Sequence, residues 1–265
     1  MRAFSISFRV VRIRSSRAAH MVAAAALAAL VAAWSAACGV PLVRHYEYEE
    51  DMTVALDGSA TITVNASLAA LVALRGAALD TRPAARFDAS KVRAFFTSPV
   101  TRVLRVSSSR QRGRRFTYVR IETDDIRRLS AAAPFAWSTY QLERTTGQVT
   151  YRQVVGAPPA TAGPVDARWQ GNEIVAFRLH LPSRITYHNT PSKIVERGNI
   201  LTWEQPLSDR RAGVPVTLEV RMEPTSILYR TLWLFAISGL AATAVMAALI
   251  WWAFRRGRRA DASGP

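Results

Sequence analysis

Residues 46–64 read YEYEEDMTVALDGSATITV and carry the strongest local hairpin pattern of the chain. Apolar side chains alternate with polar ones on both sides of Asp57-Gly58, a dipeptide typical of two-residue hairpin turns. The pattern therefore predicts two antiparallel strands joined by a tight turn. Glu50 interrupts the alternation, which indicates a bulge or the exposed start of the first strand.

Four acidic residues gather in the first of these strands: Glu47, Glu49, Glu50 and Asp51. They do not have the spacing of an EF-hand calcium loop. We expect them to form a charged, solvated face of an edge strand, a feature that protects sheets against edge-to-edge aggregation.

The remainder of residues 39–226 carries mainly strand patterns, separated by turns that contain Gly, Asn or Pro. Further strands are expected at 103–109, 115–122, 137–144, 149–155, 175–181, 200–204 and 218–222, with 185–188 as an extension of the strand at 175–181 past Pro182. Short helices are expected at 68–74 and 88–96, and a third between Asp124 or Asp125 and Pro134. This order predicts the α+β class, with an antiparallel, β-rich domain of about nine strands and two or three short helices.

An uncharged run from Thr231 to Phe254 predicts one C-terminal transmembrane helix, assigned to residues 227–254. The run covers about 36 Å as a helix, and the hydrocarbon core of a bilayer is about 30 Å thick. The basic residues Arg255, Arg256, Arg258 and Arg259 follow at once. Because positive flanks stay inside, we expect a cytoplasmic tail at 255–265 and an extracytoplasmic domain at 38–226.

Residues 1–37 have the pattern of a secretory signal peptide: an arginine-rich start, an apolar run from Met21 to Ala37, and small residues at the end. Small residues directly before Cys38 resemble the lipobox of bacterial lipoproteins, which implies a lipid on that cysteine. The motif departs from the family at Ser35, where leucine is usual. An ordinary signal peptide or an uncleaved anchor is the alternative, and a start at Met21 would lose the positive flank.

The composition excludes several classes of protein. The 265 residues are 49% hydrophobic and 20% charged, which is incompatible with a disordered chain. Much of the net charge of +16 flanks the hydrophobic segments, with five arginines and no acid in 1–37 and four arginines against one aspartate in 255–265. We therefore expect these arginines to determine the orientation of the chain in a membrane and not to bind nucleic acid. With Cys38 as the single cysteine, no intramolecular disulfide is possible.

Two stretches in the C-terminal third of the sequence resemble a known protein family. Leu181-Pro182-Ser183 and the stretch from Val195 to Trp203 (VERGNILTW) precede a final strand, the apolar run and the basic tail. Together with the lipobox, this order resembles the LppM-type lipoproteins of bacteria. The resemblance implies an exported α+β domain that contacts envelope lipids and no established catalytic residues. Residues 70–170 contain no motif that takes part in it.

The chain contains no recognisable catalytic motif. No nucleophile elbow, Walker loop or dinucleotide fingerprint occurs, and the four histidines are not at metal-ligand spacing. We expect His180 to be a solvated or hydrogen-bonded surface residue. No catalytic residue, metal or cofactor is expected.

The best candidate for a binding site is the tip of the hairpin around Gly113. Arg110, Arg112, Arg114 and Arg115 cluster there, with aromatic residues behind them. Such a basic loop on a membrane-anchored domain could contact anionic lipid headgroups. A solvated loop tip is the alternative interpretation.

These observations favour a non-enzymatic lipoprotein of the bacterial cell envelope, anchored in the cytoplasmic (inner) membrane, whose partners are membrane lipids or an envelope protein. Two alternatives stay open. One is an envelope enzyme that uses carboxylates such as Asp124 and Asp125, and the other is a structural subunit of a membrane complex.

Overall fold

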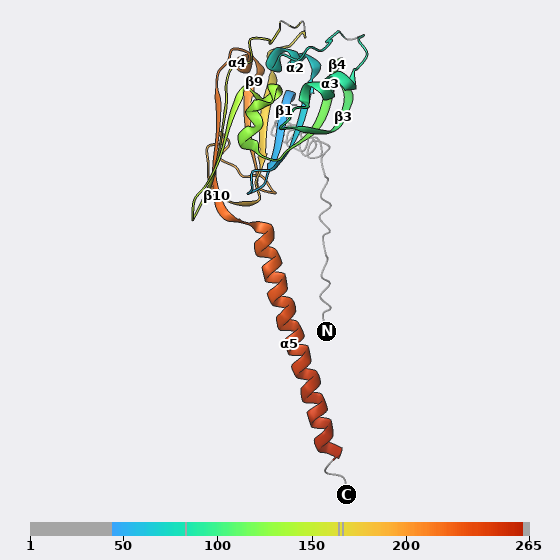
Figure 1. Ribbon diagram of the computed structural model, residues 1–265, viewed down its shortest axis with the longest axis vertical. Helices are drawn as coiled ribbons and strands as arrows, with labels where there is room; N and C mark the ends of the chain where they lie inside the picture. Colours follow the sequence, from blue (N-terminus) through green and yellow to red (C-terminus); the bar gives the residue numbers. More distant parts are fainter. Residues whose placement is uncertain (1–43, 83, 164, 166, 262–265) are drawn as a thin grey trace, which may run out of the picture. The chain divides into compact units, whose positions relative to one another are not determined.

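A computed structural model describes residues 44–261 apart from 83, 164 and 166, and for 253–261 it describes the backbone only. The signal segment and Cys38 therefore lie outside the described residues. The described part contains two β-sheets, short helices and one long C-terminal helix (Figure 1). The expected α+β class, with mostly antiparallel strands, is confirmed.

The larger sheet has six strands in the order β3-β4-β2-β1-β7-β9. Its strands are β1 (His45–Val54), β2 (Ala60–Ser67), β3 (Arg102–Gln111), β4 (Arg114–Thr123), β7 (Glu173–His180) and β9 (Ile200–Pro206). The hairpins β1–β2 and β3–β4 form where the turn residues predict them. One pairing was not predicted: β1 lies beside β7 in parallel orientation.

The smaller sheet has four strands in the order β5-β6-β10-β8. Its strands are β5 (Ser138–Arg144), β6 (Val149–Val155), β8 (Ser183–His188) and β10 (Val216–Ser226). The two sheets pack on each other, since their inward side chains form one hydrophobic core. Met52 of β1 and Tyr151 of β6, for example, are both buried and in contact across the sheets.

The short helices follow local signals. Ser67 caps α2 (Leu68–Arg75) and Gly76 ends it, while Asp88 caps α3 (Ala89–Phe96), as expected. The third expected helix is instead a pair of 3₁₀ turns, Ile126–Ala131 and Ala133–Phe135, and Pro134 lies in the first turn of the second. The five-residue α4 (Leu207–Arg211) was not predicted.

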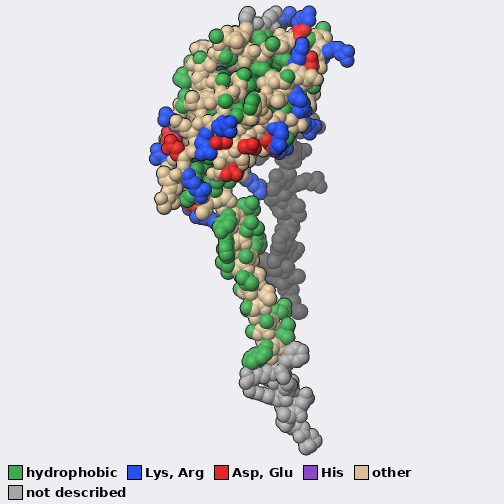
Figure 2. Space-filling model, in the orientation of Figure 1, with side chains coloured by type: hydrophobic (Ala, Val, Ile, Leu, Met, Phe, Trp, Pro, Cys, Tyr) green, Lys and Arg blue, Asp and Glu red, His purple; other side chains and the backbone are tan. Residues whose placement is uncertain are grey.

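The C-terminal helix α5 (Ile227–Asp261) follows β10 directly. Its segment Ile227–Trp252 has a mean hydropathy of 2.1 and none of it is buried, so by length and composition it can cross a membrane. Figure 2 shows hydrophobic side chains along the visible face of this helix. The four arginines from Arg255 to Arg259 fall in the part of α5 whose side chains are not described.

The expectation of an exposed acidic edge strand is wrong. β1 lies inside the six-stranded sheet, between β2 and β7. A register shift between Tyr46 and Tyr48 places Glu47 on the buried side, and Glu50 shares the buried face of Tyr48. Both glutamates are 2% exposed. Local patterning missed this arrangement because β7, the second neighbour of β1, is more than a hundred residues away in the sequence.

Candidate functional site

The β3–β4 hairpin tip forms one wall of a pocket of about 430 Å³. The pocket lies where β1 begins, where β2 passes into α2, and where the loop before β7 returns to the sheet. Among the residues that the structure describes, the lining includes five arginines and no acidic residue: Arg82, Arg112, Arg114, Arg115 and Arg168, with His45, Ser67, Leu68, Ala69, Thr81, Gly113, Ala167 and Gln170. We call this site the arginine pocket.

Arg114 is held from behind by two buried carboxylates. Its Nη1 lies 2.7 Å from Glu47 Oε1, and its Nη2 lies 3.5 Å from Glu173 Oε1. Burial opposes the charged form of Glu173, but the backbone N–H groups of Gln170 and Gly171, together with Arg114, outweigh it and lower the pKa. The charge of Arg114 is therefore compensated, and the residue lines the pocket as a paired cation.

Three of the other arginines have no acidic partner within residues 44–252, leaving aside the undescribed positions 83, 164 and 166. Arg115 donates to the carbonyl of Ala85 at 2.9 Å, which leaves its charge uncompensated. Within the described part of the chain, Arg112 and Arg168 have neither a hydrogen bond nor an ion pair. By contrast, Arg82 forms an ion pair with Asp80, whose pKa this hydrogen bond lowers to about 2.

The two unpaired arginines also have unusual backbones. Arg112 and Arg168 have φ angles of 50° and 47°, in the left-handed region that non-glycine residues rarely adopt. A non-glycine residue in this region costs roughly 1–2 kcal/mol. Local strain of this kind often accompanies functional sites, and here two strained residues from distant segments line the same pocket.

The start of α2 adds a further favourable element for an anion. Ser67 accepts a hydrogen bond from the Ala70 N–H at 3.0 Å, and the first turn of the helix contains no acidic residue. The N–H groups at Leu68 and Ala69 lie at the positive end of the helix dipole, which attracts anions. Both residues line the pocket.

The structure thus brings together three of the four arginines expected at the hairpin tip, namely Arg112, Arg114 and Arg115. Arg110 is not among the residues that line the pocket. Sequence reasoning missed Arg82, Arg168 and His45, which come from separate segments. It also treated Arg114 as a free cation, although two buried glutamates pair with it.

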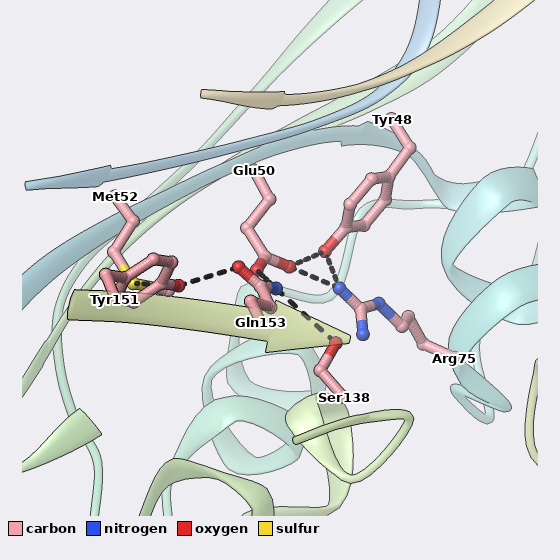
Figure 3. A network of polar contacts seen from close by, with 7 residues as sticks. All are labelled: Tyr48, Glu50, Met52, Arg75, Ser138, Tyr151 and Gln153. Atoms are coloured by element: carbon pink, nitrogen blue, oxygen red, sulfur yellow. Dashed lines mark hydrogen bonds and ion pairs between the residues drawn. The ribbon is translucent and has the colours of Figure 1, made fainter. Parts of the chain in front are cut away.

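A second polar cluster lies between the sheets (Figure 3). Arg75 of α2 donates through Nη2 to the hydroxyl of Tyr48 and to Glu50. Gln153 Nε2 donates to Glu50 Oε1 at 3.3 Å, and Tyr151 donates to Gln153 Oε1 at 2.8 Å. All five side chains are at most 3% exposed, so this cluster is closed to solvent.

A second buried arginine borders the same cluster. Arg210 of α4 donates to the carbonyls of Val155, Gly156 and Val214. Burial, and then the charge of Arg75, lowers the pKa of Arg210 to about 10. Both guanidiniums lie over the Trp137 ring, at 3.4 Å for Arg75 and 5.2 Å for Arg210 from the ring centroid. The cluster ties α2 and α4 to the core.

The carboxylates named for an enzymatic alternative have separate environments. Asp125 accepts hydrogen bonds from the Arg127 backbone and side chain, and this contact lowers its pKa. Asp124 lines an open groove of about 410 Å³ together with Glu122. Within the described residues, no group of three or more His, Cys, Asp or Glu side chains could hold a metal ion.

Fold and site together define an α+β two-sheet domain with a basic pocket, followed by one helix long enough to cross a membrane. No protein-family model matches the chain, and no curated protein matches it. Among solved structures, it is similar to the folded domain of LppM from Mycobacterium tuberculosis, determined by NMR. The identity is 15% and the TM-score 0.38, over 69% of this chain and 94% of that domain. These values do not assign the chain to a family.

Proposed function

We propose that the protein is a non-enzymatic lipoprotein of the bacterial cell envelope whose extracytoplasmic domain binds phosphate-bearing lipid headgroups in the arginine pocket. The observation that carries this proposal is the convergence of Arg112, Arg115 and Arg168 beside the N-terminus of α2, none of which has an acidic partner among the described residues. Guanidinium groups suit phosphate because their planar N–H donors can bind two oxygens at once.

The dimensions and lining of the pocket favour a headgroup over a whole lipid. Its volume falls within the range of about 300–1,000 Å³ that is usual for small-molecule sites. Most of its lining residues are polar or charged, and an acyl chain would leave their hydrogen-bonding groups without partners. The acyl part would remain in its membrane while the headgroup enters the pocket.

The anchoring belongs to the same proposal. α5 crosses the cytoplasmic membrane, and the arginines from Arg255 to Arg259 hold its C-terminal end in the cytoplasm. A lipid on Cys38 supplies a second attachment. Changing Cys38 to Ala should abolish metabolic labelling with palmitate and leave a longer precursor, whereas unchanged labelling would contradict the lipoprotein assignment.

Headgroup binding can be tested independently of membrane geometry. The full chain in a neutral detergent would be titrated with short-chain phosphatidylglycerol and, for comparison, short-chain phosphatidylcholine, with binding followed by calorimetry. Each arginine near anionic lipid contributes about 1 kcal/mol, so replacing Arg112 and Arg168 by Ser should weaken binding about 30-fold.

A matched control exists on the same hairpin. Arg105 and Arg120 are exposed, lie opposite each other on β3 and β4, and are not part of the pocket. Replacing both by Ser makes the same change in charge and should leave the affinity nearly unchanged. If both double variants lost affinity equally, binding would depend on the overall positive charge of the domain and not on the pocket. The absence of any preference for phosphatidylglycerol over phosphatidylcholine would refute the proposed function.

A further inference from the structure

The strand register places the arginine pocket at one end of the two-sheet domain. His45, which lines the pocket, is level with Glu173 at the start of β7. Ser67 is level with Phe116, directly after the arginines of β4. Figure 1 shows α2 at this end of the sheets.

Helix α5 begins at the other end of the domain. Ser226, the last residue of β10, pairs with Ser183, and the Ile227 N–H donates to the Pro182 carbonyl at 2.9 Å. Pro182 follows β7, whose first residue, Glu173, marks the pocket end. Pro182 lies nine positions after Glu173 along nearly extended chain, which corresponds to about 30 Å.

The junction between the domain and α5 contains no linker. The Tyr229 N–H donates to Ser226 Oγ at 3.1 Å, and Arg230 Nη1 lies 2.8 Å from Glu223 Oε2 on β10. These contacts connect the first turn of α5 to the end of the domain that is remote from the pocket. A membrane crossed by α5 must therefore begin close to this end.

We infer that the arginine pocket binds headgroups of a lipid surface other than the membrane that α5 crosses. The inference rests on the proposed function and adds which lipid surface carries the bound headgroups. At physiological ionic strength the Debye length is about 8 Å, so charges about 30 Å from a bilayer surface are separated from it by several screening lengths. Attraction to anionic lipid is confined to about one such length. The pocket is thus placed to act in trans.

A vesicle-capture experiment tests this position. The full chain would be reconstituted into dense, sucrose-loaded vesicles of phosphatidylcholine, with outward-facing domains verified by protease digestion. Fluorescent second vesicles, of phosphatidylcholine with or without phosphatidylglycerol, would then be added and the dense vesicles sedimented. We expect co-sedimentation only of the vesicles with phosphatidylglycerol, and its loss as salt rises from about 0.1 M to about 1 M.

Variants identify the cause of capture. The double change Arg112→Ser and Arg168→Ser should abolish it, and the control pair Arg105→Ser and Arg120→Ser should retain it. Each protein would also be prepared with Cys38→Ser, so that an N-terminal lipid cannot cause capture by insertion, and capture should persist. Thermal unfolding of every variant would verify that the domain is folded.

The possible failures are distinguishable. A chain that binds short-chain phosphatidylglycerol in detergent but captures no second vesicle would overturn the trans position and leave the proposed function intact. Capture that is insensitive to the pocket variant, or that disappears with Cys38→Ser, would likewise overturn it. A chain that fails to bind the short-chain lipid at all would contradict the proposed function itself.

Discussion

Glu50 is the buried carboxylate that compensates the charge of Arg75 in the interior of the domain. Its carboxylate is the acceptor for Arg75 and lies in a cluster that holds a second buried guanidinium, Arg210. Removing one partner of a buried pair leaves the other charge uncompensated, which typically costs 3–5 kcal/mol. Glu50→Gln keeps the size of the side chain and should lower the free energy of unfolding by about 3 kcal/mol.

Denaturant unfolding of the full chain in mild detergent, followed by near-ultraviolet circular dichroism, would measure this loss. Glu49→Gln is the matched control, because Glu49 lies on the opposite face of β1, where it pairs with the half-buried Arg178. Such partly exposed pairs contribute about 1 kcal/mol or less. Similar losses in both variants would show that the buried cluster has no special role.

His180 provides a pH-dependent contact on the outer face of the larger sheet. A hydrogen bond with Asp51 at 3.1 Å outweighs partial burial and raises the pKa of His180 above 6.5. Because folding favours the protonated ring, this stabilisation is complete below the ordinary value and is lost as pH rises through the raised pKa.

Nuclear magnetic resonance of the histidine ring protons would measure the shift. The pKa of His180 should be above 6.5 in the wild type and fall towards it in Asp51→Asn. His188 serves as an internal reference, since burial and then Lys193 lower its pKa. A His180 pKa that does not respond to Asp51→Asn would show that another group is responsible.

Among single elements, two glycines allow the cost of a left-handed backbone to be distinguished from the cost of a steric collision. Gly76, which ends α2, and Gly113, in the β3–β4 turn, have φ angles of 67° and 75°. An added Cβ at Gly113 meets nothing within 4 Å, whereas at Gly76 it meets the side chain of Thr161 and, at 3.1 Å, its backbone carbonyl carbon. The first substitution introduces conformational strain only, and the second adds a collision.

We therefore expect Gly113→Ala to lower the free energy of unfolding by roughly 1 kcal/mol, the cost of a left-handed alanine. Gly76→Ala should lower it by at least about 2 kcal/mol, because the loop around Thr161 must move as well. Unfolding in denaturant would compare the two variants. Equal losses of unfolding free energy in the two variants would show that the loop around Thr161 can move without a measurable loss of stability.

The elements differ in how far sequence could predict them. The β1–β2 and β3–β4 hairpins and the caps of α2 and α3 depend on neighbouring residues, so local patterns identified them. The parallel pairing of β1 with β7 depends on residues far apart in the chain, which no periodicity encodes. For the same reason Glu47 and Glu50 were assigned to an exposed edge.

The candidate site shows the same division. The arginines of the hairpin tip were visible because they are contiguous in the sequence. Arg82 and Arg168 joined them only through the folding of separate loops, and the partners of Arg114 are glutamates of β1 and β7. Sequence therefore predicted a basic tip. The structure shows a pocket in which Arg82 and Arg114 pair with carboxylates, while the other three arginines have no acidic partner among the described residues.

In the whole molecule, the length of the strands separates the basic pocket from the start of α5. One end of the sheets carries the basic pocket, and the other continues into a helix with no buried residue in its apolar segment. Under the proposed function, this division holds the pocket away from the membrane that α5 would cross, provided that the domain lies outside the cytoplasm. Topology is therefore the property on which the proposal as a whole depends.

Intact spheroplasts that produce the chain with a C-terminal epitope tag would test this topology. The 26 residues from Ile227 to Trp252 cover about 39 Å as a helix, enough for one crossing of a bilayer core of about 30 Å. External protease should therefore digest the domain and leave a small tagged fragment, which disappears only after permeabilisation. Replacing Arg255, Arg256, Arg258 and Arg259 by Ser should reduce the protected fraction, because these charges determine the orientation. A wild-type tag that is lost without permeabilisation would place the arginine pocket in the cytoplasm, away from the envelope lipids it is proposed to bind.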